Sequence, residues 1–305
     1  MNIFLTGATG YIGSRVAQRL TQHGHTVTAL ARTPERAARL QNLGYQTMLG
    51  DLTDPASLVT PAQQADGVIH TAFNHATDFF EGVEVERGVM DALLSALRGS
   101  GKPLVASNGS GILGDTGTVP VDEHFSLPAD WPVAERGQFE QTLQQAANEG
   151  VRTSVLRIPI LAYGHGESQL VPLLINTARD AGAAYYVGDG DNRLSSAHVD
   201  DIADLYLLAL ERAPGGSIYN VAVGESVAAR DLAEAICQLL GGETRAQSVT
   251  FERAGEIWNP FLATLLSMNN QLSADKAMQE LGWQPKGPSL LDDIAHGSYR
   301  QATVV

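Results

Sequence analysis

Three glycines near the start of the chain have the spacing of a phosphate-binding turn. The first 13 residues read Met-Asn-Ile-Phe-Leu-Thr-Gly-Ala-Thr-Gly-Tyr-Ile-Gly, which puts glycine at positions 7, 10 and 13. Gly7 permits a sharp turn, Gly10 lets the backbone approach a pyrophosphate, and Gly13 lets a helix pack closely on a strand. The N-terminus of that helix offers free N–H groups and the positive end of a dipole. We expect a nucleotide site here, although similar turns also occur where nothing binds.

A second group suited to binding a phosphate is the guanidinium of Arg32. The strand pattern over 26–30 is followed by Ala31-Arg32-Thr33-Pro34. At this point a dinucleotide-binding fold that prefers NAD carries an acidic residue for the ribose 2′-hydroxyl. A guanidinium can instead hold a 2′-phosphate through charge-assisted hydrogen bonds, with help from the Thr33 hydroxyl. The residue therefore indicates NADP (NADPH), and the alternative is a solvated arginine beside a helix start.

These groups need a scaffold in which strands and helices alternate. Short apolar strand patterns over 3–5, 26–30, 46–49, 67–72 and 103–107 are separated by helical patterns. Consecutive βα units predict a parallel sheet covered on both faces, with a ligand across the carboxyl ends of the strands. We therefore predict an α/β fold, a Rossmann-type doubly wound parallel sheet of about seven strands with a smaller, mostly helical C-terminal lobe.

Two domains are expected from this pattern. Residues 1–160 would form the NADP-binding domain, with its sheet completed by segments near 195–222. Residues 161–195 and 223–305 would form the C-terminal lobe, which would bind the substrate. The lobe's aromatic side chains would either wall a substrate pocket or belong to its core, and they are Tyr185, Tyr186, Trp258 and Phe261.

Composition excludes several classes of protein. The 305 residues include 20 Lys and Arg against 34 Asp and Glu, a formal charge of −14, which argues against a general nucleic-acid or anionic-membrane binder. Cys237 is the single cysteine, so an intrachain disulfide and a cysteine-cluster metal site are excluded. Met1 leads directly into the first strand, and no apolar run is long enough to span a bilayer. We expect a cytoplasmic monomer or homodimer that acts on a small molecule.

The spacing G-x-x-G-x-x-G over Thr6–Gly13 resembles the opening of the extended and atypical short-chain dehydrogenase/reductases, the superfamily that includes the NAD-dependent epimerases and dehydratases. Leu-Ser-Ala-Asp-Lys-Ala over 272–277 and Leu-Gly-Trp-Gln-Pro over 281–285 resemble the family's closing helix and its ending. The likeness thus runs from Met1 to about Pro285. It implies a dinucleotide cofactor and a cleft that holds both cofactor and substrate.

The resemblance also implies which residues bind that cofactor. Asp51 matches an aspartate that bonds the adenine amino group, and the alternative is a helix cap before Pro55. The segment 67–72 is similar to an apolar stretch that runs over the phosphates and ribose, and its His70 is interpreted as structural. The expected cofactor-binding residues are Gly7, Thr9, Gly10, Tyr11, Ile12, Gly13, Arg32, Asp51, Leu52, Thr71, Ala72 and Pro159.

The catalytic positions of the resembled enzymes are changed in this chain. Those enzymes use a Tyr-x-x-x-Lys pair, in which the tyrosine exchanges a proton with the substrate oxygen and the lysine binds the nicotinamide ribose. Aligning Glu140 with the acidic residue after that motif puts Arg136 on the lysine and Pro132 on the tyrosine. Arginine stays protonated, so Arg136 could bind the ribose or polarise an oxygen but cannot shuttle a proton. Counting back from Gly114 puts Gly109 on the family's catalytic serine.

Two hydroxyl groups remain as candidate contacts to a substrate. Ser110 flanks Gly109 and could hydrogen-bond a carbonyl oxygen, although any strand end can carry such a glycine-rich loop. Tyr163 lies in a segment that resembles the one packed against the nicotinamide, and the alternative is a tyrosine packed beneath a loop. The catalytic candidates are therefore Arg136, Ser110 and Tyr163.

A second cluster of polar residues begins at His198. Asp200 and Asp201 follow it at a helix start, where carboxylates meet free N–H groups, so capping explains them and we expect no metal site. In sugar-nucleotide enzymes of the family an arginine before this helix grips the substrate phosphates. Arg193 is close to that position but one residue out of register.

Three functions stay open at this point. The leading one is an NADP-dependent oxidoreductase of the atypical short-chain type, which transfers a hydride to a small carbonyl, imine or activated alkene. The missing Tyr-x-x-x-Lys pair would also suit a redox-silent NADP-binding sensor or scaffold. The overall likeness allows a sugar-nucleotide epimerase or dehydratase, which the missing tyrosine opposes.

Overall fold

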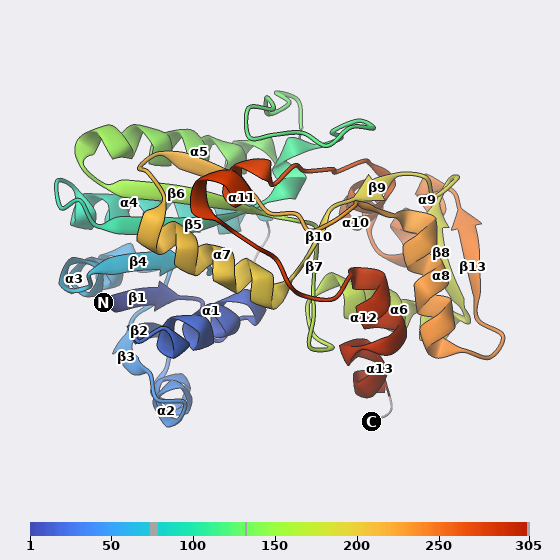
Figure 1. Cartoon of the computed structure of the whole chain (residues 1–305), viewed down its shortest axis with the longest axis horizontal. Coiled ribbons are helices and arrows are strands. Elements are labelled where there is room, and N and C mark those ends of the chain that lie inside the picture. The colour runs from blue at the N-terminus through green and yellow to red at the C-terminus, as the bar shows by residue number, and fades with distance from the viewer. Residues whose placement is uncertain (74–78, 132, 304–305) are drawn as a thin grey trace.

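The computed structural model describes residues 1–73, 79–131 and 133–303, so Pro132 lies outside the described residues. Within these residues a seven-stranded sheet has the order β11-β6-β5-β4-β1-β2-β3, with every neighbouring pair parallel (Figure 1). This confirms the predicted Rossmann-type, doubly wound sheet. Its strands are β1 (Asn2–Thr6), β2 (Thr26–Ala31), β3 (Gln46–Leu49), β4 (Gly67–His70), β5 (Pro103–Gly109), β6 (Arg152–Ile158) and β11 (Ser217–Asn220).

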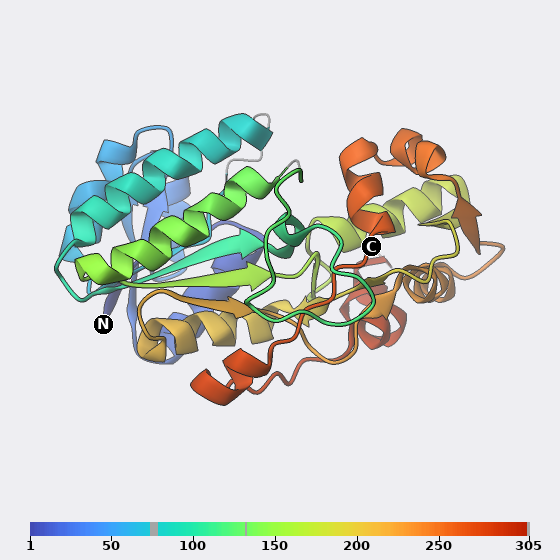
Figure 2. The ribbon, with the colours of Figure 1, turned by 90° about the horizontal axis from the view of Figure 1, so that it is seen from above.

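Helices cover both faces of this sheet (Figure 2). One face packs against α1, α2 and α7, and the other packs against α3, α4 and α5. None of the helices in the described ranges is long and apolar enough to cross a membrane. The helices of the two layers are α1 (Tyr11–Gln22), α2 (Pro34–Asn42), α3 (Val59–Gln64), α4 (Phe79–Leu97), α5 (Ala134–Ala146) and α7 (Val199–Arg212).

The first strand shows why the sheet must be covered twice. Successive side chains of a strand point to opposite faces. Ile3 and Leu5 are fully buried beneath α1 and α7, and Phe4 between them is fully buried beneath α3 and α4. A continuous apolar run of this kind is typical of a parallel strand buried on both sides.

Parallel strands bring the residues that follow them to one edge of the sheet. The glycine turn follows β1, and each of the next five strands leads into a loop at the same edge. The first residues after these six strands are Gly7, Arg32, Gly50, Thr71, Ser110 and Pro159. This edge is where a doubly wound sheet binds its ligand.

The C-terminal lobe adds smaller sheets and helices beside that edge (Figure 1). Strand pairs β10-β7, β12-β9 and β13-β8 and a third buried apolar cluster belong to it. The lobe's strands are β7 (Leu161–Tyr163), β8 (Ala183–Val187), β9 (Arg193–Leu194), β10 (Ser196–His198), β12 (Val227–Ala228) and β13 (Arg245–Val249). Its helices are α6 (Leu170–Ala181), α8 (Ala229–Leu240), α9 (Phe251–Ile257), α10 (Pro260–Ser267), α12 (Leu290–His296) and α13 (Ser298–Thr303).

Between α10 and α12 the chain returns to the large sheet. Asn270 is fully buried, and its Nδ2 donates to the carbonyl oxygens of Ser110 and Gly114 at 3.1 and 3.2 Å. Helix α11 (Asp275–Leu281) then packs against α7 and β11, and Trp283 Nε1 donates to Asp201 O at 2.9 Å. Residues 270–283 therefore connect the lobe to the sheet through buried contacts.

A buried ion pair joins β5, β6 and α5. Arg157 Nη2 donates to Glu140 Oε2 at 2.8 Å, and Arg157 Nε donates to Glu140 Oε1 at 3.1 Å. Both side chains are 3% exposed. Asn108 Nδ2 donates to Glu140 Oε1 at 3.0 Å, which adds the end of β5 to the network. The pair holds the helix that carries Arg136 against the sheet edge.

Loss of this carboxylate should destabilise the protein strongly. In Glu140→Ala the Arg157 guanidinium stays buried without its partner, so we expect the free energy of unfolding in urea to fall by about 3–5 kcal/mol. The control is Glu149→Ala, because Glu149 pairs at 2.8 Å with Arg98 where both side chains are more than half exposed. That variant should lose about 1 kcal/mol or less. Equal losses in the two variants would contradict a structural role for the buried pair.

Candidate functional site

A cleft of about 830 Å³ opens at the carboxyl edge of the sheet. Its volume lies within the range typical of ligand sites, about 300–1,000 Å³. The residues that follow β1 to β6 line it together with α6 and α10 of the lobe. All the cofactor-binding residues expected from the sequence line this one cleft, and they are Gly7, Thr9, Gly10, Tyr11, Ile12, Gly13, Arg32, Asp51, Leu52, Thr71, Ala72 and Pro159.

The glycine turn leaves room only for backbone. Gly7 has a φ of +81°, and a Cβ there would lie 2.6 Å from Thr71 Oγ1. A Cβ on Gly13 would lie 2.1 Å from Gly7 O, so the helix could not pack against the turn. Gly10 caps α1 with no side-chain hydrogen bond to the first helical turn, which lies at the cleft. A narrow cradle at an uncapped helix N-terminus fits the phosphates of a dinucleotide.

Two arginines, and not one, line the cleft after β2. Arg32 was expected there, and Arg36 in the first turn of α2 lines the same cleft and was missed from the sequence. Thr33 Oγ1 accepts from Arg36 N at 3.3 Å and so caps the helix. Its O–H stays available as a donor, and its contact with a phosphate stays a prediction. The pattern Arg-Thr-Pro-x-Arg, with a cap residue between two arginines four positions apart, was the available signal for Arg36.

Asp51 is held in a local turn at the end of β3. Its Oδ1 accepts hydrogen bonds from Thr53 N and from Thr53 Oγ1, both at 2.9 Å. The Thr53 backbone hydrogen bond, with smaller effects from the Thr53 hydroxyl and Arg32, holds the pKa of this carboxyl below its usual value. The N-cap of the helical turn that follows is Asp54, which makes no side-chain cap bond. Asp51 thus stays ionised at the cleft, and its contact with adenine stays a prediction.

Arg136 is fixed by a buried carboxylate. Its Nε and Nη2 donate to Glu86 Oε2 and Oε1 at 2.8 and 2.9 Å, and Glu86 on α4 is buried. The guanidinium carbon lies 4.2 Å from the centroid of the Phe73 ring. A Cβ built on Gly109, the position of the family's serine, would lie 3.9 Å from Arg136 Nη1. Arg136 therefore lines the cleft as an oriented cation beside the position that the serine would take.

The two hydroxyl candidates are both bonded within the chain. Ser110 lines the cleft, but it is fully buried and its Oγ donates to Asn270 Oδ1 at 2.6 Å. Tyr163 does not line the cleft, since its ring packs against His198 and its hydroxyl donates to Pro288 O at 2.5 Å. Tyr163 is therefore a tyrosine packed beneath a loop, and we do not retain it as a candidate proton donor.

The strand ends beneath the cleft carry a buried histidine. Ser107 lines the cleft, and its hydroxyl donates to His70 O at 3.0 Å and contacts the Tyr206 hydroxyl. His70 Nδ1 lies 2.7 Å from Thr6 Oγ1, and its Nε2 has no hydrogen-bond partner among the described residues. Burial lowers the pKa of His70 to about 4. A neutral, enclosed imidazole agrees with its interpretation as structural.

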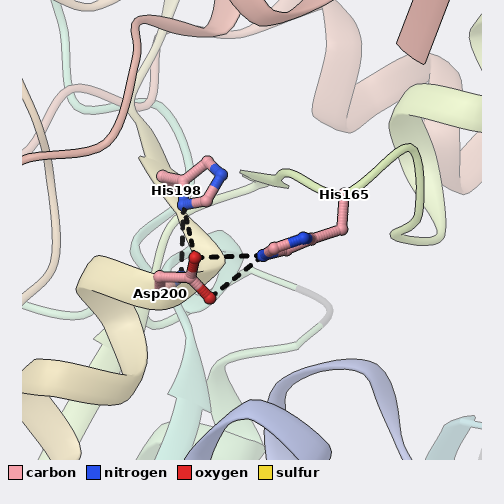
Figure 3. Close-up of side chains that lie close together, drawn as sticks. All are labelled: His165, His198 and Asp200. Atoms are coloured by element: carbon pink, nitrogen blue, oxygen red, sulfur yellow. Dashed lines mark hydrogen bonds and ion pairs between the residues drawn. The ribbon is translucent and has the colours of Figure 1, made fainter. Parts of the chain in front are cut away.

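The polar residues at the start of α7 form a small cluster with a loop histidine (Figure 3). His165, His198 and Asp200 place one nitrogen or oxygen each within 4.8 Å of one another. His198 Nδ1 caps α7 by accepting from Asp200 N at 3.3 Å, and the Asp200 carboxylate lies 3.0 Å from His165 Nε2. Asp201 accepts from Lys286 N and from Gly287 N at 2.7 and 3.0 Å. The side-chain cap of α7 is therefore His198 and not an aspartate, while both aspartates lie in the first turn, where the helix dipole favours negative charge.

The lobe contributes side chains that the sequence did not single out. Of the four aromatic residues expected as walls, only Phe261 lines the cleft, while Tyr185, Tyr186 and Trp258 line a separate cavity of about 20 Å³ inside the lobe. The remaining lobe residues at the cleft come from β7, from the start of α6 with the two residues before it, and from α10. The lobe's lining residues are Ala162, Ser168, Gln169, Leu170, Leu173, Phe261, Leu262 and Leu265.

Comparison with known proteins gives the chain a family and a fold. A sequence profile described as the NAD dependent epimerase/dehydratase family matches residues 3–222. An uncharacterized protein of Schizosaccharomyces pombe is 36% identical over 300 residues, 98% of this chain and 100% of the relative. The 4-hydroxy-2-methyl-3-oxo-4-farnesyl-3,4-dihydroquinoline-1-oxide ketoreductase of Stigmatella aurantiaca is 30% identical over 310 residues, 93% of this chain and 92% of the relative.

Among solved structures, the UDP-glucose 4-epimerase of Thermus thermophilus in complex with NAD superposes with a TM-score of 0.78. It is 22% identical, and the match covers 99% of this chain and 100% of that one. A likeness at this identity shows the shared fold.

The buried histidine predicts a pH dependence of stability. The unfolded chain protonates His70 as the pH falls below about 6.5, whereas the native imidazole stays neutral down to about 4. The native state then binds fewer protons, so stability is lost as the pH falls through this window. Between pH 7 and pH 5 the free energy of unfolding in urea should fall by ~2 kcal/mol more in the wild type than in His70→Asn. Replacement of the exposed His124 by Asn serves as the control, and an equal fall in wild type and His70→Asn would refute the assignment.

Proposed function

Because this chain belongs to the NAD dependent epimerase/dehydratase family, we propose that it is an NADP-dependent oxidoreductase of the atypical short-chain type. It would transfer a hydride to a small carbonyl, imine or activated alkene. Curated relatives include a ketoreductase and UDP-glucose 4-epimerases. The observation that carries the proposal is the single cleft that joins a glycine cradle, two arginines and an oriented arginine at the opposite end.

The preference for NADP is supported by charge at the second strand end. Arg32 and Arg36 both line the cleft and are both exposed, so their guanidinium groups can approach a 2′-phosphate without losing a buried partner. The first residue after β2 is thus a cation, where an NAD-specific fold carries a carboxylate for the 2′-hydroxyl.

Arg136 is the residue of this chain to which we assign a catalytic role. When bound, a reduced nicotinamide would supply a hydride to the carbonyl carbon, so that the ketone becomes an alcohol and NADPH becomes NADP⁺. Arg136, held by Glu86, would stabilise negative charge on the substrate oxygen or hold the nicotinamide ribose. It keeps its proton at neutral pH, so it would act by charge and position.

The proton for the product oxygen is proposed to come from water. Besides the arginines, the ionisable residues that line the described cleft are Tyr11 and Asp51. Tyr11 donates to Gly164 O at 3.1 Å, and burial raises the pKa of its hydroxyl. Asp51 belongs to the end of β3, on the far side of the glycine turn from Arg136. Neither group is placed as an acid for a substrate beside Arg136.

A redox-silent NADP-binding sensor is the second candidate. It is favoured by the internal bonds of Ser110 and Tyr163, which leave no family-type acid among the described cleft residues. Titration with NADPH by intrinsic fluorescence, followed by a screen of ketones, imines and activated alkenes for cofactor oxidation, separates the two functions. Tight binding without oxidation of NADPH by any of them would favour the sensor.

Removal of the strand-end arginines should change cofactor preference. In Arg32→Ala and in Arg36→Ala we expect the Kd for NADPH to rise by about 10–100-fold, because each loses a charge-assisted contact worth about 1.5–3 kcal/mol. The Kd for NADH should change by less than about twofold, since NADH carries no 2′-phosphate. Arg39→Ala is the matched control, because Arg39 is an exposed arginine on the same helix that does not line the cleft. Equal losses for NADPH and NADH would argue against a 2′-phosphate site.

Arg136 should matter for turnover more than for folding. Arg136→Gln combined with Glu86→Gln removes both charges of the pair, so no buried carboxylate is left alone. With whichever acceptor the screen finds, kcat/KM should fall about 100-fold, as for loss of one donor to a developing oxyanion. An unchanged Kd for NADPH would then place Arg136 at the substrate oxygen, and a raised one would place it at the ribose. Full activity in the double variant, with Arg87→Gln on α4 as the surface control, would exclude either role.

A further inference from the structure

We propose that the substrate end of the cleft selects an uncharged carbonyl compound that carries an apolar substituent and excludes nucleoside-diphosphate sugars. This inference rests on the oxidoreductase function proposed above and narrows its substrate class. Three features of the cleft support it, namely its apolar wall, the placement of its charges and the exposure of its mouth.

The wall that faces the sheet edge is apolar. Helix α6 contributes Leu170 and Leu173, and α10 contributes Phe261, Leu262 and Leu265. Phe79 at the start of α4 extends this wall, with its ring centroid 6.2 Å from that of Phe261. The two lobe helices come from segments about 90 residues apart in the chain, and Figure 2 shows both on the lobe side of the strand ends. An apolar substituent is the ligand group that such a surface stabilises by burial.

The substrate end of the cleft carries a single charged lining residue, Arg136, among the described residues. Arg32, Arg36 and Asp51 follow β2 and β3, at the opposite end of the sheet edge from β6. Arg136 is the remaining lining cation, and two of its nitrogens are engaged by Glu86. A diphosphate placed against leucine and phenylalanine would lose hydration without gaining a counter-charge, which is strongly unfavourable. An iminium cation would likewise find no carboxylate there among the described lining residues.

The arginine that could have served a sugar nucleotide is directed elsewhere. Arg193 lies on β9, and its Nη1 donates to Ser226 O at 2.7 Å. It does not line the cleft. The polar groups that the lobe does offer are uncharged, Ser168 and Gln169. Both can hydrogen-bond a neutral ligand, and neither neutralises a phosphate.

Large apolar side chains are also exposed at this mouth. Phe261 is 45% exposed and Leu173 is 40% exposed. Exposed apolar side chains that cluster at the rim of a cleft mark a binding groove more often than isolated ones do. Because both are partly exposed, they can be replaced without opening a cavity in the core of the lobe.

The test compares Phe261→Gln with Phe251→Gln. Phe251 is the matched control, since it is 44% exposed, lies near the start of the neighbouring helix α9 and does not line the cleft. Calorimetric titration in saturating NADP⁺ measures binding of 4-phenyl-2-butanone and of UDP-glucose without requiring turnover. We expect the aryl ketone to bind the wild type, and Phe261→Gln to weaken it about tenfold while Phe251→Gln changes it less than twofold. UDP-glucose should show no binding to any of them.

Turnover provides the second measurement. In Phe261→Gln, kcat/KM for 4-phenyl-2-butanone should fall about tenfold, whereas that for propanone should stay within twofold, because propanone has no group that reaches the wall. Leu173→Gln should act in the same direction, and thermal unfolding of each variant verifies that it folds.

The outcomes separate this inference from the function on which it rests. If the aryl ketone binds in a way that depends on Phe261 but NADPH is not oxidised, the apolar site is supported and the proposed oxidoreductase function is contradicted. If only polar or charged acceptors oxidise NADPH, and Phe261→Gln does so at the wild-type rate, the oxidoreductase function is supported and the inference about the apolar substrate is overturned. Binding of UDP-glucose that is tighter than that of the ketone would also overturn it.

Discussion

The parallel direction of all seven strands is the constraint on which the site depends. Parallel neighbours cannot be joined by a tight turn, so each pair needs a crossover, and the strands' carboxyl ends meet at one edge. Helices on both faces bury the side chains of the sheet, as Ile3, Phe4 and Leu5 show, and buried polar groups such as Arg157 are bonded within the chain. Polar and flexible residues therefore gather in the six loops at this edge, and the cleft is the space between those loops and the lobe.

Hydrogen bonds within the chain determine which side chains of these loops remain available to contact a substrate. Ser110 is bonded to Asn270, and Tyr163 to the carbonyl oxygen of Pro288, so both hydroxyls serve the architecture. Arg136 is also bonded, but its partner Glu86 is buried behind it, and the pairing orients the guanidinium at the cleft. What remains for catalysis is mainly fixed positive charge, which stabilises a developing anion but cannot deliver a proton.

The sequence predicted those features that short segments determine. The glycine turn, the strand that precedes it and the helix that follows are contiguous, so their order could be read from residues 1–20, and the later strand ends follow from the same alternation. Tyr163 could not be placed in this way, because its partner Pro288 lies 125 residues away. The same holds for Asp200 on α7, whose partner His165 lies in the loop after β7. The aromatic residues of the lobe required knowledge of how β8, α8 and α9 pack.

The return of the chain to the sheet at Asn270 makes much of the lobe an insertion between two fixed points. One point is β11, which pairs with β6, and the other is Asn270, which is bonded to the loop after β5. Lengthening a segment whose two ends are held costs closure entropy that grows only slowly with length. Over evolutionary time the helices between 221 and 269 could therefore change in sequence and size while the cofactor edge stayed as it is. The chain in effect separates the sheet edge, where we propose that the cofactor binds, from a part that is free to diverge.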